Sequence, residues 1–310
     1  MKNDRNDRNE KNIHDCKIND SRKVFPTTFS NYKKNVAVKE FMNNIYYQKK
    51  EESYFWTAEL LCSNYIIEIW DTYIEIMCKY THIYNPKLPI YLHKKFLDFK
   101  EIAGKTNDDI QLRNIDEIRR IFFSLTLIFC CSKRECVLDT PTFEFNFEID
   151  KMYMNLKAPN VSYIQNYFKT GDPKEYYIPL NELMYHLKET KNKMDIFYWI
   201  EWIIAYDALL LKNKKQLQCV KRSFSVNTNI IWIIWELLLS FEKPPIESLL
   251  HLFSIKYKNN KKKKCLLHLS VMYIITKVDY NIPILDSGLL KNMEESIIIA
   301  FEKIKKKEIA

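Results

Sequence analysis

Apolar side chains recur every three or four residues over most of the chain, which is the spacing of one face of an α-helix. Residues 54–80 show it clearly, with Trp70, Tyr73 and Ile74 on one face. The same spacing predicts further helices over residues 91–103, from residue 114, and over residues 160–169, 172–190, 193–212, 228–241, 246–257, 262–278 and 286–307. The sequence therefore predicts an all-α protein of about nine to eleven helices, packed as antiparallel helical bundles because the connections are short.

One segment departs from the helical period. Phe143, Phe145, Phe147 and Ile149 alternate with polar residues, which is the period of a β-strand. No second run of this kind supplies a pairing strand. We therefore expect one short extended segment near residues 141–149, laid over helices.

The first 50 residues differ in composition from the rest of the chain. They begin MKNDRNDRNEKN and carry 12 basic against 6 acidic side chains. Apolar residues are few here, which predicts a polar, basic and largely disordered tail over residues 1–50, with an ordered arm around residues 41–47. The break in helical period near residue 150 divides the remainder into an N-terminal helical subdomain, residues 51–150, and a C-terminal helical subdomain, residues 151–310.

Glycine is scarce, with three in 310 residues, and this excludes several classes of site. Phosphate loops, dinucleotide fingerprints and nucleophile elbows all need glycines at fixed spacings. The eight cysteines form no paired framework and no secretory signal precedes them, which indicates reduced thiols in an intracellular compartment. No apolar run reaches the ~18 residues of a membrane-spanning helix.

The net charge of +9 is uneven, because residues 51–310 carry 36 basic and 33 acidic side chains. Lysine outnumbers arginine by 40 to 8, and this excess together with scarce glycine is typical of an AT-rich genome. Part of the basic balance therefore reflects codon bias. Arginine, which suits bidentate recognition of phosphate, is rare.

Two basic clusters without an intervening acid stand out in the C-terminal half. The 212–222 cluster comprises Lys212, Lys214, Lys215, Lys221 and Arg222, and the 256–264 cluster comprises Lys256, Lys258, Lys261, Lys262, Lys263 and Lys264. Both lie at ends of predicted helices. If these ends converge, they form one positive face for nucleic acid or an acidic partner. The alternative is a set of solvated loops enriched in lysine by codon bias.

Four tryptophans form two pairs at helical i, i+3 spacing: Trp199 with Trp202, and Trp232 with Trp235. Residues so spaced share a helix face. An aromatic groove of this kind can stack bases or accept a partner's apolar side chain. The surrounding isoleucines and leucines favour the alternative, a buried seam between packed helices.

Candidate chemistry is sparse. Three carboxylates lie within apolar helices, where burial can raise a pKa and enable acid–base catalysis; they are Glu201, Asp207 and Glu236. No histidine or metal ligand accompanies them at a suitable spacing. The clustered thiols, Cys130, Cys131 and Cys136, lack the second ligand pair of a zinc site. We therefore expect no catalytic site, no metal and no cofactor.

Several strings carry a family resemblance. They are NPKLPIYL, LKAPNVSYIQNYFKTGDPKE, YWIEWI, IIWIIWELLL and LFSIKYKNNKKKKCLLHLS, spread over residues 54–280. Together they resemble an uncharacterised all-helical protein family of nucleocytoplasmic large DNA viruses (giant viruses). None is a catalytic or ligand motif. The resemblance implies an intracellular viral protein, in the host cytoplasm or nucleus or in the virion, with no assigned activity.

The functional expectation is a non-enzymatic binding or scaffold protein whose basic face contacts nucleic acid or an acidic partner. The alternative is a structural subunit of a virion, or of a replication or transcription complex, that binds protein through its aromatic helices. No small-molecule substrate and no membrane span are expected.

Overall fold

The chain is described by a computed structural model. It covers residues 16–20, 26–106, 108–134, 137–138, 142–145, 147–148, 152–255, 260–290 and 292–308. Within these ranges the protein is all-α, as predicted, and its β-structure is limited to one isolated bridge between Thr27 and Lys33. None of the described helices is both long and apolar enough to cross a membrane.

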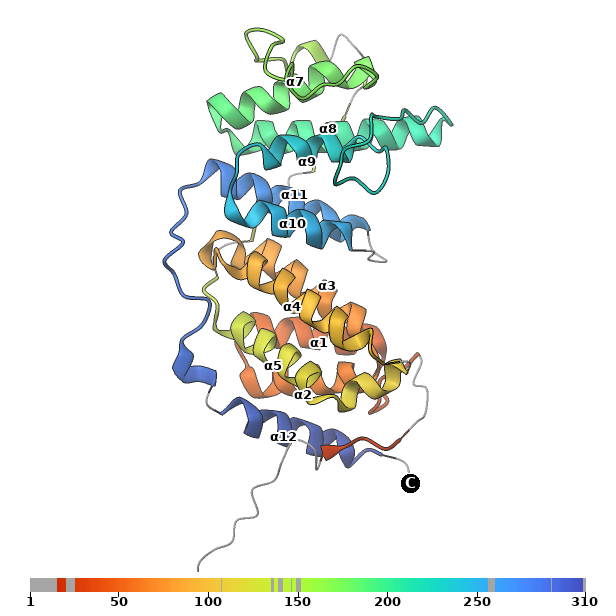
Figure 1. Ribbon diagram of the computed structural model, residues 1–310, viewed down its shortest axis with the longest axis vertical. Helices are drawn as coiled ribbons and strands as arrows, with labels where there is room; N and C mark the ends of the chain where they lie inside the picture. The colour runs from red at the N-terminus through yellow and green to blue at the C-terminus, as the bar shows by residue number, and fades with distance from the viewer. Residues whose placement is uncertain are drawn as a thin grey trace, which may run out of the picture. The chain divides into compact units, whose positions relative to one another are not determined.

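The helices fall into two compact units (Figure 1). Unit 1 comprises Met1–Met77, Tyr91–Lys133 and Pro283–Ala310, and unit 2 comprises Cys78–Ile90 and Arg134–Ile282. The chain crosses from unit 1 to unit 2 at residues 133–134, close to the break in helical period that the sequence shows. The end of the chain differs from the expected subdomain 151–310, because residues 283–310 belong to unit 1.

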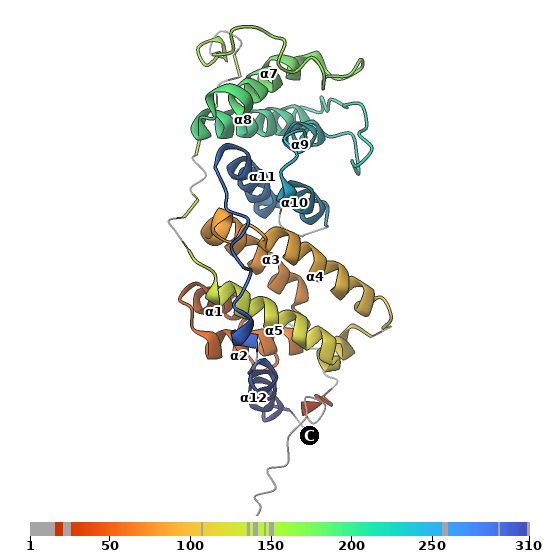
Figure 2. The ribbon, with the colours of Figure 1, turned by 60° about the vertical axis from the view of Figure 1, so that its left-hand side comes forward.

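The C-terminal helix explains this difference. Helix α12 (Met293–Lys305) buries an apolar face made of Ile297, Ala300, Phe301 and Ile304. That face packs on α2 (Lys50–Cys62) and α5 (Asp116–Cys131), and Figure 2 shows α12 beside them. Periodicity predicts that a helix needs a packing partner, but it does not identify which helix that partner is.

The expected disordered tail over residues 1–50 is corrected in its second half. Helix α1 (Lys34–Tyr46) buries Ala37, Phe41 and Ile45 and contacts α2, α3 (Ile66–Ile76) and α5. These three residues are spaced four positions apart and form a narrow apolar stripe on one helix face. The mostly polar sequence around them makes this stripe hard to predict. Residues 1–15 and 21–25 lie outside the described residues.

The remaining helix of unit 1 is most of α4 (Leu88–Ala103). The single helix predicted over residues 54–80 is instead α2 and α3, separated at Ser63–Tyr65. Asn64 adopts a left-handed φ of 57° there, a conformation that asparagine tolerates better than most residues. The aromatic residues expected on one face form the core, where Trp70 packs on Phe96 and Tyr73 stacks on Phe129.

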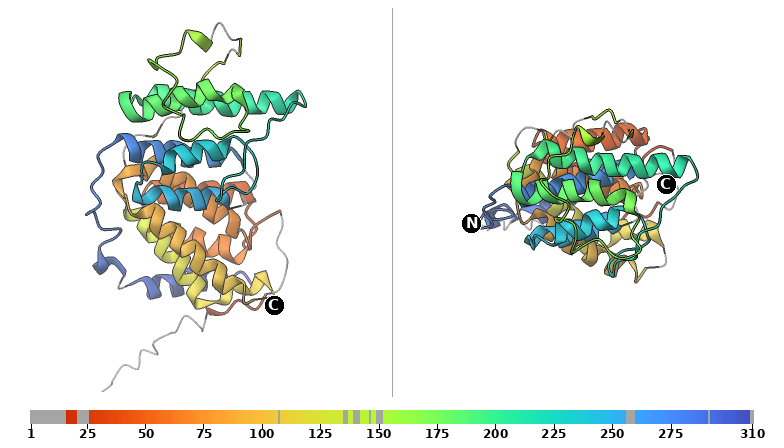
Figure 3. Two further views of the ribbon diagram at one scale, coloured as in Figure 1. Left: turned by 45° about the horizontal axis from the view of Figure 1, so that its top comes forward. Right: turned by 90° about the horizontal axis from the view of Figure 1, so that it is seen from above.

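Unit 2 contains the other helices. They are α7 (Tyr177–Tyr185), α8 (Lys193–Lys212), α9 (Ile231–Leu239), α10 (Pro244–Ser254) and α11 (Asn260–Ile275). Figure 3 shows α7 lying along α8, and the two helices are in contact. The predicted bounds of α8 are confirmed. Asn192 caps its start by accepting hydrogen bonds from the backbone N–H groups of Met194 and Asp195.

The helix predicted over residues 160–169 is wrong, because this segment forms turns. Side chains of α7 satisfy its backbone instead. Asn181 Oδ1 accepts from Tyr163 N and Asn181 Nδ2 donates to Asn160 O, at 3.0 and 2.8 Å. A buried amide that bonds backbone groups in this way competes with the helical pattern.

The extended aromatic segment lies over α8, as expected. Phe143 and Phe145 pack on Tyr198, with ring centroids 5.3 and 5.6 Å away. Phe147 packs on Trp202 at 5.4 Å. The last alternating residue, Ile149, lies outside the described residues. The described part of the segment thus covers one face of α8, and no strand pairs with it within the described residues.

Candidate functional site

The connection between α8 and α9, residues 213–230, carries most of the 212–222 cluster. Figure 3 shows it leaving the end of α8 and returning to α9. The chain turns at Lys214, which has a left-handed φ of 57°, and Lys215 N donates to Leu210 O at 2.8 Å. Further along, Cys219 N donates to Thr228 O at 2.8 Å, which joins the two arms of the connection.

A buried arginine network holds this connection in place. The Arg222 guanidinium makes a bidentate pair with Asp172, at 2.7 and 2.8 Å, and its Nε donates to Glu236 at 2.7 Å. It also donates to the carbonyls of Val220 and Tyr167. Asp172 in turn accepts from Val220 N at 2.9 Å. The arginine therefore ties the connection to α9 and to the turn before α7.

Electrostatics of the network follow from this geometry. Burial works to raise the pKa of Asp172, but the hydrogen bonds from Arg222, Lys169 N and Val220 N outweigh it and lower the pKa. Burial likewise works to lower the pKa of Arg222, and its two carboxylate partners raise it. Both groups are therefore charged at neutral pH.

Arg222 must accordingly be removed from the predicted binding face. It is 2% exposed and its charge is matched by two carboxylates, so it cannot contact a partner. Its burial is not evident from the sequence, because the two acids lie 50 and 14 residues away along the chain. The sequence around Arg222 contains no acidic residue, but folding places Asp172 and Glu236 against it.

Four lysines of the 212–222 cluster remain available. They are exposed and, within the described residues, none of them makes an ion pair; we call them the connection lysines, Lys212, Lys214, Lys215 and Lys221. The first three surround the C-terminus of a 20-residue helix. Their favourable interaction with the helix dipole is a structural alternative to binding. Lys221 lies too far along the connection for that explanation.

The 256–264 cluster is only partly described. Lys256 and Lys258 lie outside the described residues, and for Lys261, Lys262 and Lys263 only the helical backbone of α11 is described. Lys264 Nζ contacts Glu201 Oε2 at 2.6 Å, so its charge is matched within unit 2.

A cavity of about 410 Å³ in unit 2 is lined by Lys264 of the 256–264 cluster and by part of the α8–α9 connection, but by none of the connection lysines. Gln216, which directly follows Lys215, lines one side, and Lys264 lines another. The other walls are apolar, amide-bearing or hydroxyl-bearing side chains and comprise Ile204, Val226, Asn227, Thr228, Asn229, Ile231, Trp232, Phe253 and Ser254. No described carboxylate lines the cavity. We call it the connection cavity.

The four tryptophans are buried, as the packing alternative predicts. They are at most 4% exposed. Trp202 stacks on Tyr206 with centroids 5.0 Å apart, while Trp232 and Trp235 pack on Phe253 of α10 at 5.8 and 5.2 Å. They are therefore core residues, and an open aromatic groove along α8 or α9 is absent from the described structure.

Each candidate carboxylate has a structural partner. Glu236 pairs with Arg222, and Asp207 accepts from Tyr176 Oη and Asn229 Nδ2 at 3.0 and 2.8 Å. Burial works to raise the pKa of Glu201, but the contacts with His268 and Lys264 outweigh it and lower the pKa. A lowered pKa keeps Glu201 ionised, which does not suit a general acid.

The clustered thiols show no ligand arrangement in the part of the chain that the structure describes. Cys130 is buried and donates to Ser53 Oγ at 3.4 Å, and Cys131 is half-buried. Cys136 lies outside the described residues. Within the described residues, no three histidine, cysteine or acidic side chains come together as a metal site.

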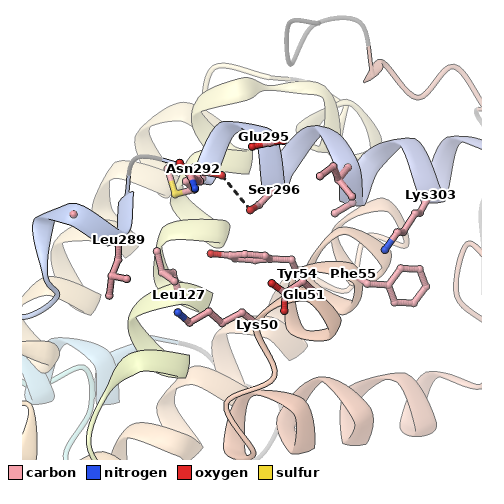
Figure 4. Close-up of a pocket in the computed structure, with 14 residues that line it drawn as sticks. Lys50, Glu51, Tyr54, Phe55, Leu127, Leu289, Asn292, Glu295, Ser296 and Lys303 are labelled. Atoms are coloured by element: carbon pink, nitrogen blue, oxygen red, sulfur yellow. Dashed lines mark hydrogen bonds between the residues drawn. The ribbon is translucent and has the colours of Figure 1, made fainter.

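Unit 1 contains a second cavity, of about 450 Å³, between α2, α5 and α12 (Figure 4). The ring of Tyr54 lies across it, and burial, with Cys130, Cys131 and Glu51 nearby, raises the pKa of that phenol well above its usual value. Lys50 and Lys303 line the cavity together with Glu51 and Glu295. The lining charges balance, so this cavity selects neither anions nor cations, and the connection in unit 2 is the stronger candidate.

Comparisons with known proteins yield no match: no family model, no curated protein and no solved structure matches the chain. The resemblance to the viral family therefore stays a prediction.

Proposed function

We propose that the protein is a non-enzymatic binding protein whose α8–α9 connection contacts the phosphate backbone of nucleic acid. The observation that carries this proposal is the group of four exposed connection lysines, none with an acidic partner within the described residues. Lysine attracts phosphate as a point charge without reading bases. Such binding is independent of sequence and depends strongly on salt, because it releases counterions.

The surroundings of the lysines support the proposal. Arg222 and Asp172 hold the backbone at Val220, and the Cys219–Thr228 hydrogen bond closes the connection. A backbone already ordered loses little further entropy on binding. An acidic protein would satisfy the same charges, but the amides and apolar groups of the neighbouring connection cavity favour bases, which have apolar faces and hydrogen-bonding edges.

Charge reversal of the connection lysines tests the proposal. In the triple variant Lys214→Glu, Lys215→Glu and Lys221→Glu, binding of a fluorescently labelled single strand should weaken. Lys212 is kept because it lies in the last turn of α8. Fluorescence anisotropy over a series of salt concentrations should show the log–log salt slope falling by about 2, since each lost contact on a single strand removes about 0.7.

A matched triple variant in unit 1 controls for net charge. Lys39→Glu, Lys94→Glu and Lys100→Glu change the same number of exposed lysines and should leave the slope unchanged. Equal losses in both variants would show a non-specific effect of net charge. Polyglutamate that competes as strongly as nucleic acid would instead favour an acidic protein partner and overturn the proposal.

A further inference from the structure

We propose that the connection cavity receives an unpaired base, so that the connection lysines select single-stranded nucleic acid over duplex. This inference rests on the proposed function, because the lysines take the phosphates that flank the inserted base. It adds the class of nucleic acid and a second set of contacting residues to that site.

The walls of the cavity suit a flat aromatic ligand. Ile204, Ile231 and Phe253 contribute apolar surface from three different helices, α8, α9 and α10. The volume of about 410 Å³ lies within the ~300–1,000 Å³ typical of ligand pockets. Burial of a base against such walls is independent of its identity, since every base has an apolar face.

The polar groups of the cavity suit a base edge. Asn227 Oδ1 accepts from Trp232 Nε1 at 2.6 Å and from Asn229 N at 3.1 Å, which fixes the orientation of its amide. The Asn227 Nδ2 donors, the Gln216 amide and the Thr228 hydroxyl have no hydrogen-bond partner within the described residues. Bases in single strands offer matching donors and acceptors on their Watson–Crick edges.

The charge around the cavity is suited to a polyanion. The one lysine that lines it among the described residues, Lys264, is paired with Glu201 and adds no net charge. Uncompensated charge lies instead outside it, on Lys214 and Lys215, and Lys215 is one residue, about 3.8 Å between Cα atoms, from Gln216. A base in the cavity therefore leaves its flanking phosphates close to these lysines.

A duplex cannot use this site without losing base pairs. Its bases are stacked and paired, and extruding one costs unstacking free energy that a single strand does not require. The duplex contacts the lysines through phosphates alone. The site thus binds both forms electrostatically, and only the single strand also fills the cavity.

Abasic strands provide the test. Fluorescence anisotropy compares an intact single strand, an abasic strand of equal length and a duplex, each with the wild-type protein at one salt concentration. We expect the intact strand to bind about tenfold or more tightly than the abasic strand, since stacking contributes this much per base. The salt slopes of the two strands should be equal, because their phosphates are the same.

Two variants of the cavity lining and one control variant outside it test the inference further. Gln216→Ala removes an amide of the cavity and Thr228→Trp fills it, and both should reduce the difference between the intact and abasic strands without changing abasic binding. Gln218→Ala, at an exposed position of the same connection outside the cavity lining, should change neither.

The outcomes separate the inference from the proposed function. Equal binding of intact and abasic strands, with a steep salt slope retained, overturns the base cavity and leaves phosphate binding in place. Duplex binding as tight as single-strand binding also overturns it. Absence of binding by every nucleic acid overturns the proposed function itself.

Discussion

Arginine is scarce in this chain, and three of the arginines that the structure describes are buried. Arg113, Arg119 and Arg222 are at most 2% exposed. Arg113 donates to Cys62 O at 3.1 Å and Arg119 to Cys16 O at 3.1 Å, so these two also bond backbone carbonyls, as Arg222 does. The planar guanidinium, with five donors, can satisfy several buried acceptors at once. These three arginines therefore stabilise the fold.

Removal of the Arg222 side chain should be strongly destabilising. Arg222→Met keeps much of the volume but leaves Asp172 without its cation, while Glu236 keeps only Lys169, 3.6 Å away. Loss of one partner of a buried ion pair costs about 3–5 kcal/mol. Urea denaturation should show this as a lower midpoint with an unchanged m-value. Arg120→Met is the control, because Arg120 pairs with Glu294 at the surface and should cost less than about 1 kcal/mol.

The destabilisation by Arg222→Met should depend on pH. In the wild-type protein the pKa of Asp172 lies below its unfolded value of about 3.9, so its contribution to stability is present above that pH and is lost as pH falls through the folded pKa. In the variant the buried carboxyl is most costly when ionised. The difference between the two proteins should therefore narrow as pH falls from neutral toward and below about 4. A difference that stays constant to about pH 3 would contradict the assigned ion pair.

At the scale of elements, the scarcity of glycine is visible at helix ends. Several helix-terminating residues adopt left-handed φ without being glycine, among them Gln48, Asn64, Lys191 and Lys214. After α1, Tyr47 N donates to Asn43 O and Lys49 N to Asn44 O around Gln48, as at a glycine-terminated helix. Each such residue carries a steric cost that glycine avoids.

Gln48→Gly should therefore stabilise the protein. Gln48 is exposed, and its φ is 59°. Glycine relieves the left-handed strain but gains entropy in the unfolded chain, which leaves a net gain of about 0.5–1 kcal/mol. Thermal or urea unfolding would measure it. Lys49→Gly is the control one residue later, where φ is −85°, and it should be neutral or destabilising.

At the scale of the whole molecule, the sequence predicts helices better than it predicts their neighbours. The bounds of α8 follow from its apolar period and the Asn192 cap, both local properties. The turn segment at residues 160–169 could not be predicted, because Asn181 satisfies its backbone from another element. The same holds for the site: the exposed lysines are evident from composition, whereas the burial of Arg222 depends on Asp172 and Glu236.

The division into two units has an energetic consequence that the order of the chain does not suggest. Residues 283–310 follow unit 2 in sequence but pack in unit 1. Within unit 1, a cation–π contact and an ion pair join α12 to α5. The Arg119 guanidinium lies 3.8 Å from the Phe301 ring centroid, and Arg120 pairs with Glu294 at 2.9 Å. Both halves of the chain are thus needed to complete unit 1.

Phe301→Ala tests this division. The ring is fully buried and contacts Phe123 and Arg119, and a Phe→Ala change in a core costs about 3–5 kcal/mol. Hydrogen exchange should show lost protection in α2, α5 and α12, while α7 to α11 keep theirs, because the lost packing lies within unit 1. Ile299→Ala is the control, since Ile299 is 46% exposed on the same helix and its loss should change protection little. Equal loss of protection in α8 and α9 would mean that the two units unfold as one cooperative body.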